Sequence, residues 1–334
     1  MDNEFVLQNK VALDMDKIKT QDENELFYFV DNNTAASERI TAPRYSYWKS
    51  VFRIFFKKKS NWVILFIFVL LILGAYLLPA IFPYNELENV LDTTSRNLAP
   101  WEAIGKLGFD LKWIFGTGRF SNSLFYGVWA SARTSLSLAL ACAAINMVLG
   151  VIIGALWGYS KVLDNIFNVI YNIISNIPYV LMISLLVYIM SRGIGSFIFA
   201  LTITGWLGIA YFFRTQVLII RDREYNLASR CLGTPIFRVV TKNVLPYLTS
   251  VIVTLIATEI PSYIGMEVFL TYIGLGLSGT EPSLGHMIDI ASDGWMTAPW
   301  GFWVPVAASA ILTISLYLMG QNLADASDPR SHMQ

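Results

Sequence analysis

The chain is poor in charged residues, cysteine and histidine. Charged residues make up 14 % of its 334 residues, against about 25 % in soluble domains. Cys142 lies in an apolar segment and Cys231 in a basic one, so we expect no disulfide between them. His286 and His332 are too few for a metal cluster, and we predict no metal site. With 55 % hydrophobic residues, this composition predicts a polytopic membrane protein.

The first residues lack the apolar core of a cleavable signal peptide. Residues 1–43 are polar and acidic, and they predict a flexible cytoplasmic tail. Residues 44–60 interleave aromatic side chains such as Trp48 and Phe52 with lysine and arginine. This pattern favours an amphipathic helix at the membrane surface, and the alternative is a solvated charged face that precedes a span.

Long apolar runs predict six transmembrane helices, the first over 61–83. The other five are expected at about 136–159, 166–190, 196–213, 247–277 and 300–320. The intervening segment 84–131 is predicted to be extracellular, 132–322 to form the core, and 323–334 to form a cytoplasmic tail. We expect a kink at Pro178. Gly150 and Gly154 have the spacing that lets membrane helices approach closely.

Basic residues cluster in two segments, and the four predicted spans between them place both segments on the same side of the membrane. Three lysines, Lys57 to Lys59, directly precede the first span, and the loop 215–246 carries a clear excess of arginine and lysine. Basic loops face the cytoplasm. The sequence therefore predicts that both termini and this loop are cytoplasmic.

The basic loop carries the most specific pattern, N-L-A-S-R-C-L-G-T-P followed by an apolar-basic run and L-P. It resembles the "EAA" loop of ABC-importer permeases, which inserts a short coupling helix into a cleft of a cytoplasmic ATPase. Leu227 stands where that family usually has glutamate. The resemblance implies an ATPase-coupling site formed by Glu224, Leu227, Ala228, Ser229, Arg230, Gly233, Thr234 and Pro246. The charge run alone would also fit plain positive-inside topology with no partner.

Three further blocks extend this resemblance in the same order along the chain. Residues 113–135 are similar to the G-T-D-x-x-G-R-D…Y-G-A-R-x-S-L signature of peptide permeases, although Gly118 and Asn122 stand within its acidic part. Residues 267–287 contain E-V-F-L-T-Y-I-G-L-G-L and P-S-L-G-H-M, and the tail contains A-D-A-S-D-P-R. The chain resembles, over roughly 45–330, oligopeptide permease subunits of the OppC/DppC type, with most similarity to the Ami-type subunits of streptococci and related bacteria.

This resemblance implies an all-α fold of the type I ABC-importer class, with six spans and a cytoplasmic coupling helix, in the bacterial cell membrane. It also implies four protein partners: a second, OppB-like permease, two cytoplasmic ATPases like OppD and OppF, and an extracellular peptide-binding lipoprotein. The chain has no Walker A sequence. We therefore expect the ATPase partners, and not this chain, to hold ATP and Mg²⁺. We also expect the chain to bind no other cofactor and no nucleic acid.

Two glutamates lie within the fifth predicted span. Carboxyl groups inside a membrane are costly and usually face the bundle interior or an aqueous path. Glu267 fits either a structural hydrogen-bonding role or a substrate contact, and Glu259 either meets a peptide amino terminus or pairs within the protein. Both are candidates for the translocation path.

Other functions also fit parts of this sequence. A dipeptide or nickel importer shares the same blocks as an oligopeptide importer. A secondary transporter or channel would need proton-relay groups on several helices, and only the two glutamates qualify. A membrane-embedded enzyme or sensor would need a nucleophile with its base, metal ligands or a soluble catalytic domain, and the sequence shows none of these.

Overall fold

The computed structural model describes residues 46–87, 89–190, 193–277 and 281–328. Almost all of these lie in a compact unit that spans Trp48–Gln334. Helices dominate this part of the chain, and a single isolated bridge, Thr117 with Ser123, is the one β contact there. The predicted tail 1–43 and the end of the predicted C-terminal tail lie outside the described residues.

The N-terminal helices are α3 (Tyr47–Lys57) and α4 (Lys59–Ile81). The segment that follows contains α5 (Pro100–Leu107) and the 3₁₀ turn η2 (Leu111–Trp113). The central helices are α6 (Leu124–Tyr159), α7 (Lys161–Ser175), α8 (Tyr179–Ile189), α9 (Ile194–Thr202) and α10 (Trp206–Arg221).

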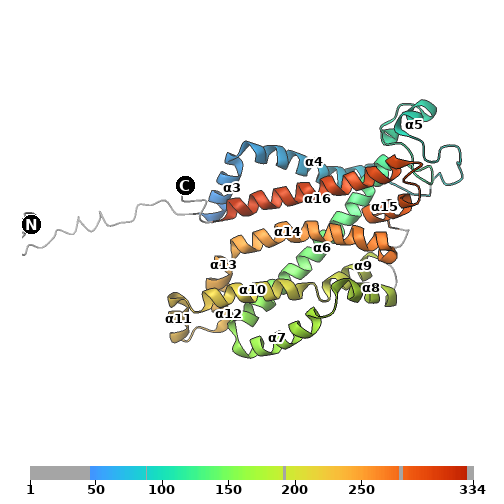
Figure 1. Ribbon diagram of the computed structural model, residues 1–334. Coiled ribbons are helices and arrows are strands. Elements are labelled where there is room, and N and C mark those ends of the chain that lie inside the picture. Colours follow the sequence, from blue (N-terminus) through green and yellow to red (C-terminus); the bar gives the residue numbers. More distant parts are fainter. Residues whose placement is uncertain (1–45, 88, 191–192, 278–280, 329–334) are drawn as a thin grey trace, which may run out of the picture. The chain divides into compact units, whose positions relative to one another are not determined.

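The basic loop contains α11 (Glu224–Cys231) and α12 (Ile236–Val239), and the π-helical turn η3 (Val240–Val244) follows. The chain then continues through α13 (Leu245–Tyr247), α14 (Thr249–Leu270), the π turn η4 (Thr271–Leu275), α15 (Leu284–Ser292) and α16 (Pro299–Ser327). Figure 1 shows α11 and α12 at one end of the long helices, and α5 and α15 at the opposite end.

In the described residues, five helical segments are long and apolar enough to cross a membrane. They are Lys59–Ile81, Leu124–Tyr159, Ile194–Arg221, Thr249–Leu275 and Pro299–Ser327. Helices α7 and α8 make a sixth if they form one span, and they are bent by 81° at the break before Tyr179. The kink predicted at Pro178 is therefore present as a sharp break. The all-helical membrane fold class is confirmed.

Three helices are longer than the apolar pattern predicts, and one of them is α10, which continues to Arg221, past the predicted end at residue 213 and into the predicted loop 215–246. Helix α6 begins at Leu124, well before the predicted span start at residue 136, because Ser123 caps it by accepting a hydrogen bond from the Tyr126 backbone N–H (3.2 Å). Its first turns are less apolar and pack against protein, so hydropathy alone does not reveal them. Helix α16 likewise continues to Ser327, into the segment predicted as a tail.

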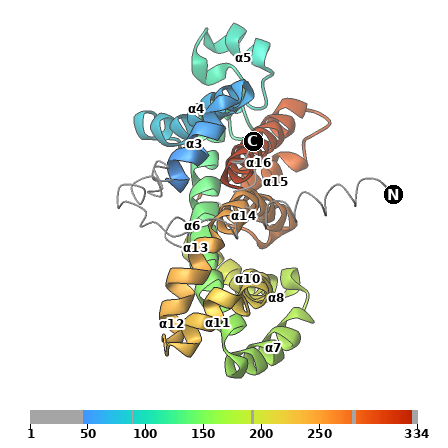
Figure 2. The ribbon, with the colours of Figure 1, turned by 90° about the vertical axis from the view of Figure 1, so that its left-hand side faces the viewer.

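Helix α6 lies at the centre of the unit and packs against α10, α14 and α4; Figure 2 shows it between the blue α4 and the α7–α10 group. Small residues bring α6 and α10 together. A Cβ atom added to Gly154 would lie 2.4 Å from the carbonyl oxygen of Ala210, and one on Gly150 would lie 2.5 Å from the Ile209 side chain. The close packing predicted from the Gly150–Gly154 spacing is confirmed, and its partner is α10.

Candidate functional site

The basic loop begins with the short helix α11. Glu224 lies in its first turn, where a negative charge interacts favourably with the helix dipole. The helix ends in a Schellman motif: Gly233 N–H donates to the Arg230 carbonyl (2.9 Å) and Thr234 N–H to the Ser229 carbonyl (3.1 Å). Gly233 has φ +75°, in the left-handed region that glycine adopts without strain. The glycine singled out in the sequence is therefore the residue that ends α11.

Most of α11 and α12 is exposed. Five large apolar side chains, 41 % to 84 % exposed, form what we call the α11–α12 surface: Tyr225, Leu227, Leu232, Ile236 and Phe237. Four exposed basic residues flank it: Arg223, Arg230, Arg238 and Lys242. Exposed apolar groups with a polar rim mark interaction surfaces. This end of the molecule therefore presents a surface suited to a protein partner.

The predicted coupling residues occupy two places. Seven of them lie on α11 and the turn that ends it, where Ser229 and Thr234 are half-buried and the other five are exposed. Pro246 stands apart in α13, where it occupies the first turn. Leu227 adds an exposed apolar side chain where the resembled family has glutamate. Contact at that position would therefore be apolar rather than ionic.

A polar group that the sequence did not single out attaches α11 to the membrane helices. Asn226 is fully buried, and its Nδ2 donates to the carbonyl oxygen of Ile220 at the end of α10 (3.0 Å). Its Oδ1 accepts from Nδ2 of Asn243 in η3 (3.2 Å), and the same Nδ2 lies 3.3 Å from Oγ of Ser229. The two asparagines are 17 positions apart, so no local pattern pairs them.

Arginine side chains join the same loop to the end of α6. Nη1 of Arg221 donates to the Gly158 carbonyl (3.1 Å). The Arg230 guanidinium lies 5.9 Å from the ring centre of Tyr159, a cation–π contact. The ends of α6, α10 and α11 thus form one connected group.

Helix α7 is fixed to α10 by an ion pair close to this group. Both oxygens of Asp164 accept from Arg214, one from Nε and one from Nη2, the latter at 3.1 Å. Nε1 of Trp157 also donates to Asp164 (2.9 Å). The pair is mostly buried, with 15 % of the arginine and 24 % of the aspartate side chain exposed. A bidentate pair with an additional donor fixes geometry better than an exposed one.

The two glutamates of α14 have different surroundings. Glu267 is fully buried; its Oε2 accepts from Oγ of Ser135 (2.7 Å) and its Oε1 from Oγ1 of Thr271 (3.1 Å). Ser135 in turn accepts from the backbone N–H of Leu284 (3.1 Å), which ties α6, α14 and α15 together. This geometry supports the structural interpretation of Glu267. Glu259 is only half-buried.

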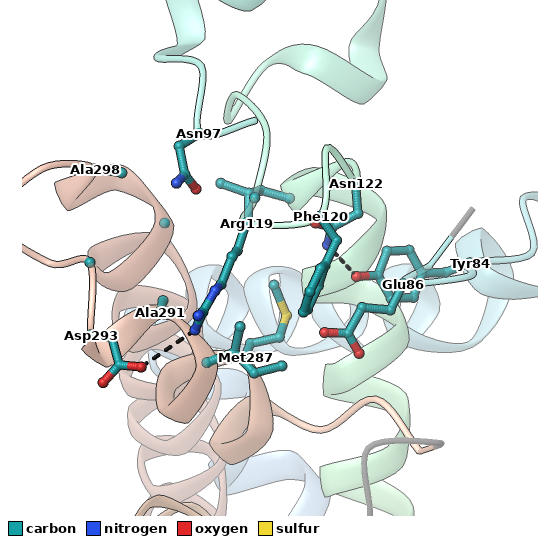
Figure 3. A pocket seen from close by; sticks show the side chains of 15 residues that line it. Tyr84, Glu86, Asn97, Arg119, Phe120, Asn122, Met287, Ala291, Asp293 and Ala298 are labelled. Carbon is teal, nitrogen blue, oxygen red and sulfur yellow. Dashed lines mark hydrogen bonds and ion pairs between the residues drawn. The ribbon is translucent and has the colours of Figure 1, made fainter. Parts of the chain in front are cut away.

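A hollow of about 250 Å³ lies at the opposite end of the molecule, between the segment before α6 and α15. Nη1 of Arg119 lies 3.4 Å from Oδ2 of Asp293, and Figure 3 shows this side chain extending across the hollow. Nδ2 of Asn122 donates to the Tyr84 hydroxyl (2.6 Å). Asn122 belongs to the block that lacks the acidic motif of the resembled family. In this chain that block instead forms the hydrogen bond from the Asn122 amide to the Tyr84 hydroxyl.

An ion pair ties the segment after α4 to α15 beside that hollow. Nε2 of His286 lies 3.3 Å from Oε2 of Glu86, and both side chains are mostly buried, with 14 % and 17 % exposed. The hydrogen bond to Glu86 raises the pKa of His286 above its usual value, against burial, which lowers it. No group of three potential metal ligands occurs among the described residues.

The chain matches two protein families. Residues 111–332, which include α11 and every helix from α6 onward, match the family described as "Binding-protein-dependent transport system inner membrane component". Residues 46–100 match the "N-terminal TM domain of oligopeptide transport permease C". The chain therefore belongs to the family of binding-protein-dependent transport system inner membrane components, and we refer to it below as the permease.

Curated relatives of the permease cover nearly its whole length. It is 45 % identical over 312 residues to the oligopeptide transport system permease protein AmiD of Streptococcus pneumoniae, across 93 % of this chain and 98 % of the relative. It is 33 % identical to the oligopeptide permease OppC of Bacillus subtilis, across 89 % and 94 %. It is 32 % identical to the dipeptide permease DppC of the same organism, across 92 % and 93 %. The resemblance read from the sequence blocks is confirmed.

Proposed function

We propose that this permease is one membrane subunit of an ATP-driven importer of oligopeptides. The observation that carries the proposal is the near full-length similarity to a permease named for oligopeptide transport, at 45 % identity. A second relative is also named for oligopeptides.

The α11–α12 surface is the proposed docking site for the cytoplasmic ATPases. Its exposed apolar side chains, with four exposed basic residues in the same segment, suit a protein partner, and the segment carries the pattern that resembles the ATPase-coupling loop. In this proposal the partners hold ATP and Mg²⁺, and this chain binds neither. A second, related permease completes the path, and an extracellular lipoprotein delivers the peptide.

The proposed location is the bacterial cytoplasmic membrane, with both termini inside. Helix α3 supports the membrane location: Trp48, Phe52 and Phe56 are 40 % to 50 % exposed, beside exposed basic residues such as Lys49 and Arg53. A helix with this composition lies in the membrane interface. The α11–α12 surface would then face the cytoplasm and the hollow beside Arg119 the outside.

We further propose that α14 lines the peptide path. Thr254, Thr258 and Ser262 follow one another at i, i+4 spacing, exposed or half-exposed, and each donates its hydroxyl to a carbonyl of its own helix. Glu259 lies in the same stretch. A polar helix face in a membrane avoids lipid and faces water or protein. Because Glu267 is enclosed within the chain, Glu259 is the better candidate for contact with a peptide amino group.

The proposed mechanism is alternating access. ATP binding closes the ATPase pair, α11 moves with it, and the membrane helices open outward to accept a peptide; hydrolysis resets them. The ATPases can bias the two states only by their differential affinity for them.

The test is purification of the chain from its native membrane in mild detergent, with mass spectrometry of what accompanies it. A second permease and P-loop ATPases are expected, and uptake of labelled peptides into vesicles that contain this complex is then measured. A homo-oligomer free of ATPases, under conditions that preserve known complexes, would overturn the proposal and favour a secondary transporter or channel.

Dipeptide import is the second candidate, because one relative at 32 % identity is named for dipeptide transport. Competition between labelled dipeptides and pentapeptides in the same vesicles separates the two. Nickel uptake is measured in parallel, and nickel transport without peptide transport would show that the resemblance had indicated the wrong substrate class.

A further inference from the structure

We propose that Asn226 is the positioning residue that makes α11 move together with the membrane helices. This inference rests on the proposed function, because it concerns how motion at the α11–α12 surface reaches α10 and α14. The group that carries it is the Asn226 side chain, the Ile220 carbonyl, Asn243 and Ser229, which we call the Asn226 clamp.

The clamp joins three elements through one buried side chain. Asn226 donates to the last turn of α10 (3.0 Å) and accepts from Asn243 in η3 (3.2 Å). Asn243 also reaches back to Ser229 on α11 (3.3 Å). The elements joined are therefore the helix that enters the loop, the loop helix itself and the segment that leaves it for α14. A displacement of α11 then acts on both neighbouring spans.

The remaining side-chain attachments of α11 are weaker. Asn226 is the one buried residue of this helix, so apolar packing contributes little. Arg230 lies 4.0 Å from Asp222, but their side chains are 49 % and 60 % exposed. Exposed ion pairs and cation–π contacts each contribute little, whereas removing one partner of a buried hydrogen bond leaves the other without its partner. The clamp is therefore the strongest side-chain link between α11 and the spans, in addition to the backbone that runs from α10 into α11, where the Arg223 N–H donates to the Ile220 carbonyl (3.1 Å).

Substitutions separate the two bonds of Asn226. Asn226→Leu has similar size and removes both, leaving the Ile220 carbonyl and Asn243 without this partner. Asn243→Leu removes the bonds to Asn226 and Ser229 but leaves Asn226 bonded to Ile220. Asn165→Leu is the matched control, because it makes the same chemical change at an exposed position of α7.

The experiment uses the complete transporter, purified with its partners and reconstituted into vesicles. Bound ATPases, ATP hydrolysis and peptide uptake are measured on the same preparation. The quantity compared is the number of peptides imported per ATP hydrolysed. A residue needed only for folding would reduce the amount of complex and leave this ratio unchanged.

We expect Asn226→Leu to retain its ATPases and to lower the ratio about five- to tenfold, the effect of losing one to two net hydrogen bonds. Asn243→Leu should lower it less, and the double variant no further than Asn226→Leu alone, because both changes break one linkage. Asn165→Leu should match the wild type.

A wild-type ratio in Asn226→Leu would overturn the inference while leaving the importer function intact. If Asn226→Leu does not assemble, Asn243→Leu decides in its place, and a wild-type ratio there overturns the inference. Absence of ATPases from the wild-type preparation would instead refute the proposed function, and the inference with it.

Discussion

Replacing Gly233 tests whether the shape of the turn that ends α11 matters for coupling. The glycine has φ +75°, and its N–H donates to the Arg230 carbonyl at 2.9 Å. An added Cβ atom would meet nothing within 4 Å. Any effect of a substitution must therefore come from backbone conformation or from contact with a partner, and not from a clash within this chain.

The magnitude follows from the left-handed conformation. A residue with a Cβ atom adopts it at a cost of roughly 1–2 kcal/mol, with asparagine as the most tolerant residue. Helix α11 buries only Asn226 and has little packing to offset that cost. About 1.4 kcal/mol is a factor of ten in population. We expect Gly233→Val to reduce peptide uptake about tenfold or more, Gly233→Ala about fivefold, and Gly233→Asn very little.

The assay is uptake of a labelled peptide into vesicles that contain the purified transporter, with ATP hydrolysis measured in parallel. Hydrolysis should continue in Gly233→Val, because the ATPase partners are unchanged. Gly208→Val is the control: Gly208 lies in α10, also has open space around it, and has helical backbone geometry. Its uptake should stay near that of the wild type.

Two results would refute this reasoning. Normal uptake by Gly233→Val would mean that the end of α11 has no role in coupling. Equal losses in Gly233→Asn and Gly233→Val would mean that the backbone conformation is not the cause and that any side chain at this position obstructs a partner.

Three further predictions concern the helix assembly. Glu267→Gln should keep most hydrogen bonds of its buried site, whereas Glu267→Leu should destabilise the purified chain by about 2–3 kcal/mol, because buried hydroxyl groups lose their acceptor. Thermal unfolding in detergent measures the stability of both variants. Equal melting temperatures of the two variants would contradict the structural role of Glu267. The pKa of His286 is raised in the folded state by Glu86, so this pair stabilises the fold fully below the unfolded pKa of about 6.5 and loses that contribution as pH rises through the folded value. The melting temperature of the wild type should fall as the pH rises through the folded pKa of His286, and this fall should be absent in His286→Gln. A His286→Gln variant with the same pH profile as the wild type would disprove the prediction. Gly154→Leu should prevent close packing of α6 on α10, because its Cβ atom would lie 2.4 Å from the Ala210 carbonyl oxygen. We expect a low yield of folded protein. A yield equal to that of the wild type would show that α6 and α10 can move apart without loss of stability.

The sequence blocks predicted the class of protein and the location of α11. A short pattern is recognisable in a sequence where the backbone conformation requires a particular residue type. Gly233 is an example, because its backbone is left-handed. Predicted helix ends were less accurate. Helix α6 begins at Leu124 because a serine cap and contacts with protein, rather than a hydrophobic run, set its start.

The sequence by itself determined the membrane class, the approximate spans and the coupling-loop pattern, because lipid requires long apolar helices and imposes a simple rule on composition. It left two roles open for Glu267, and it gave no sign of the Asn226 clamp. The surroundings of Glu267 and Asn226 come from tertiary structure, which brings Ser135 to Glu267 and Asn243 to Asn226 from 132 and 17 positions away. Hydrogen bonds between distant positions produce no periodic pattern in the sequence, because their partners come together only in the folded chain.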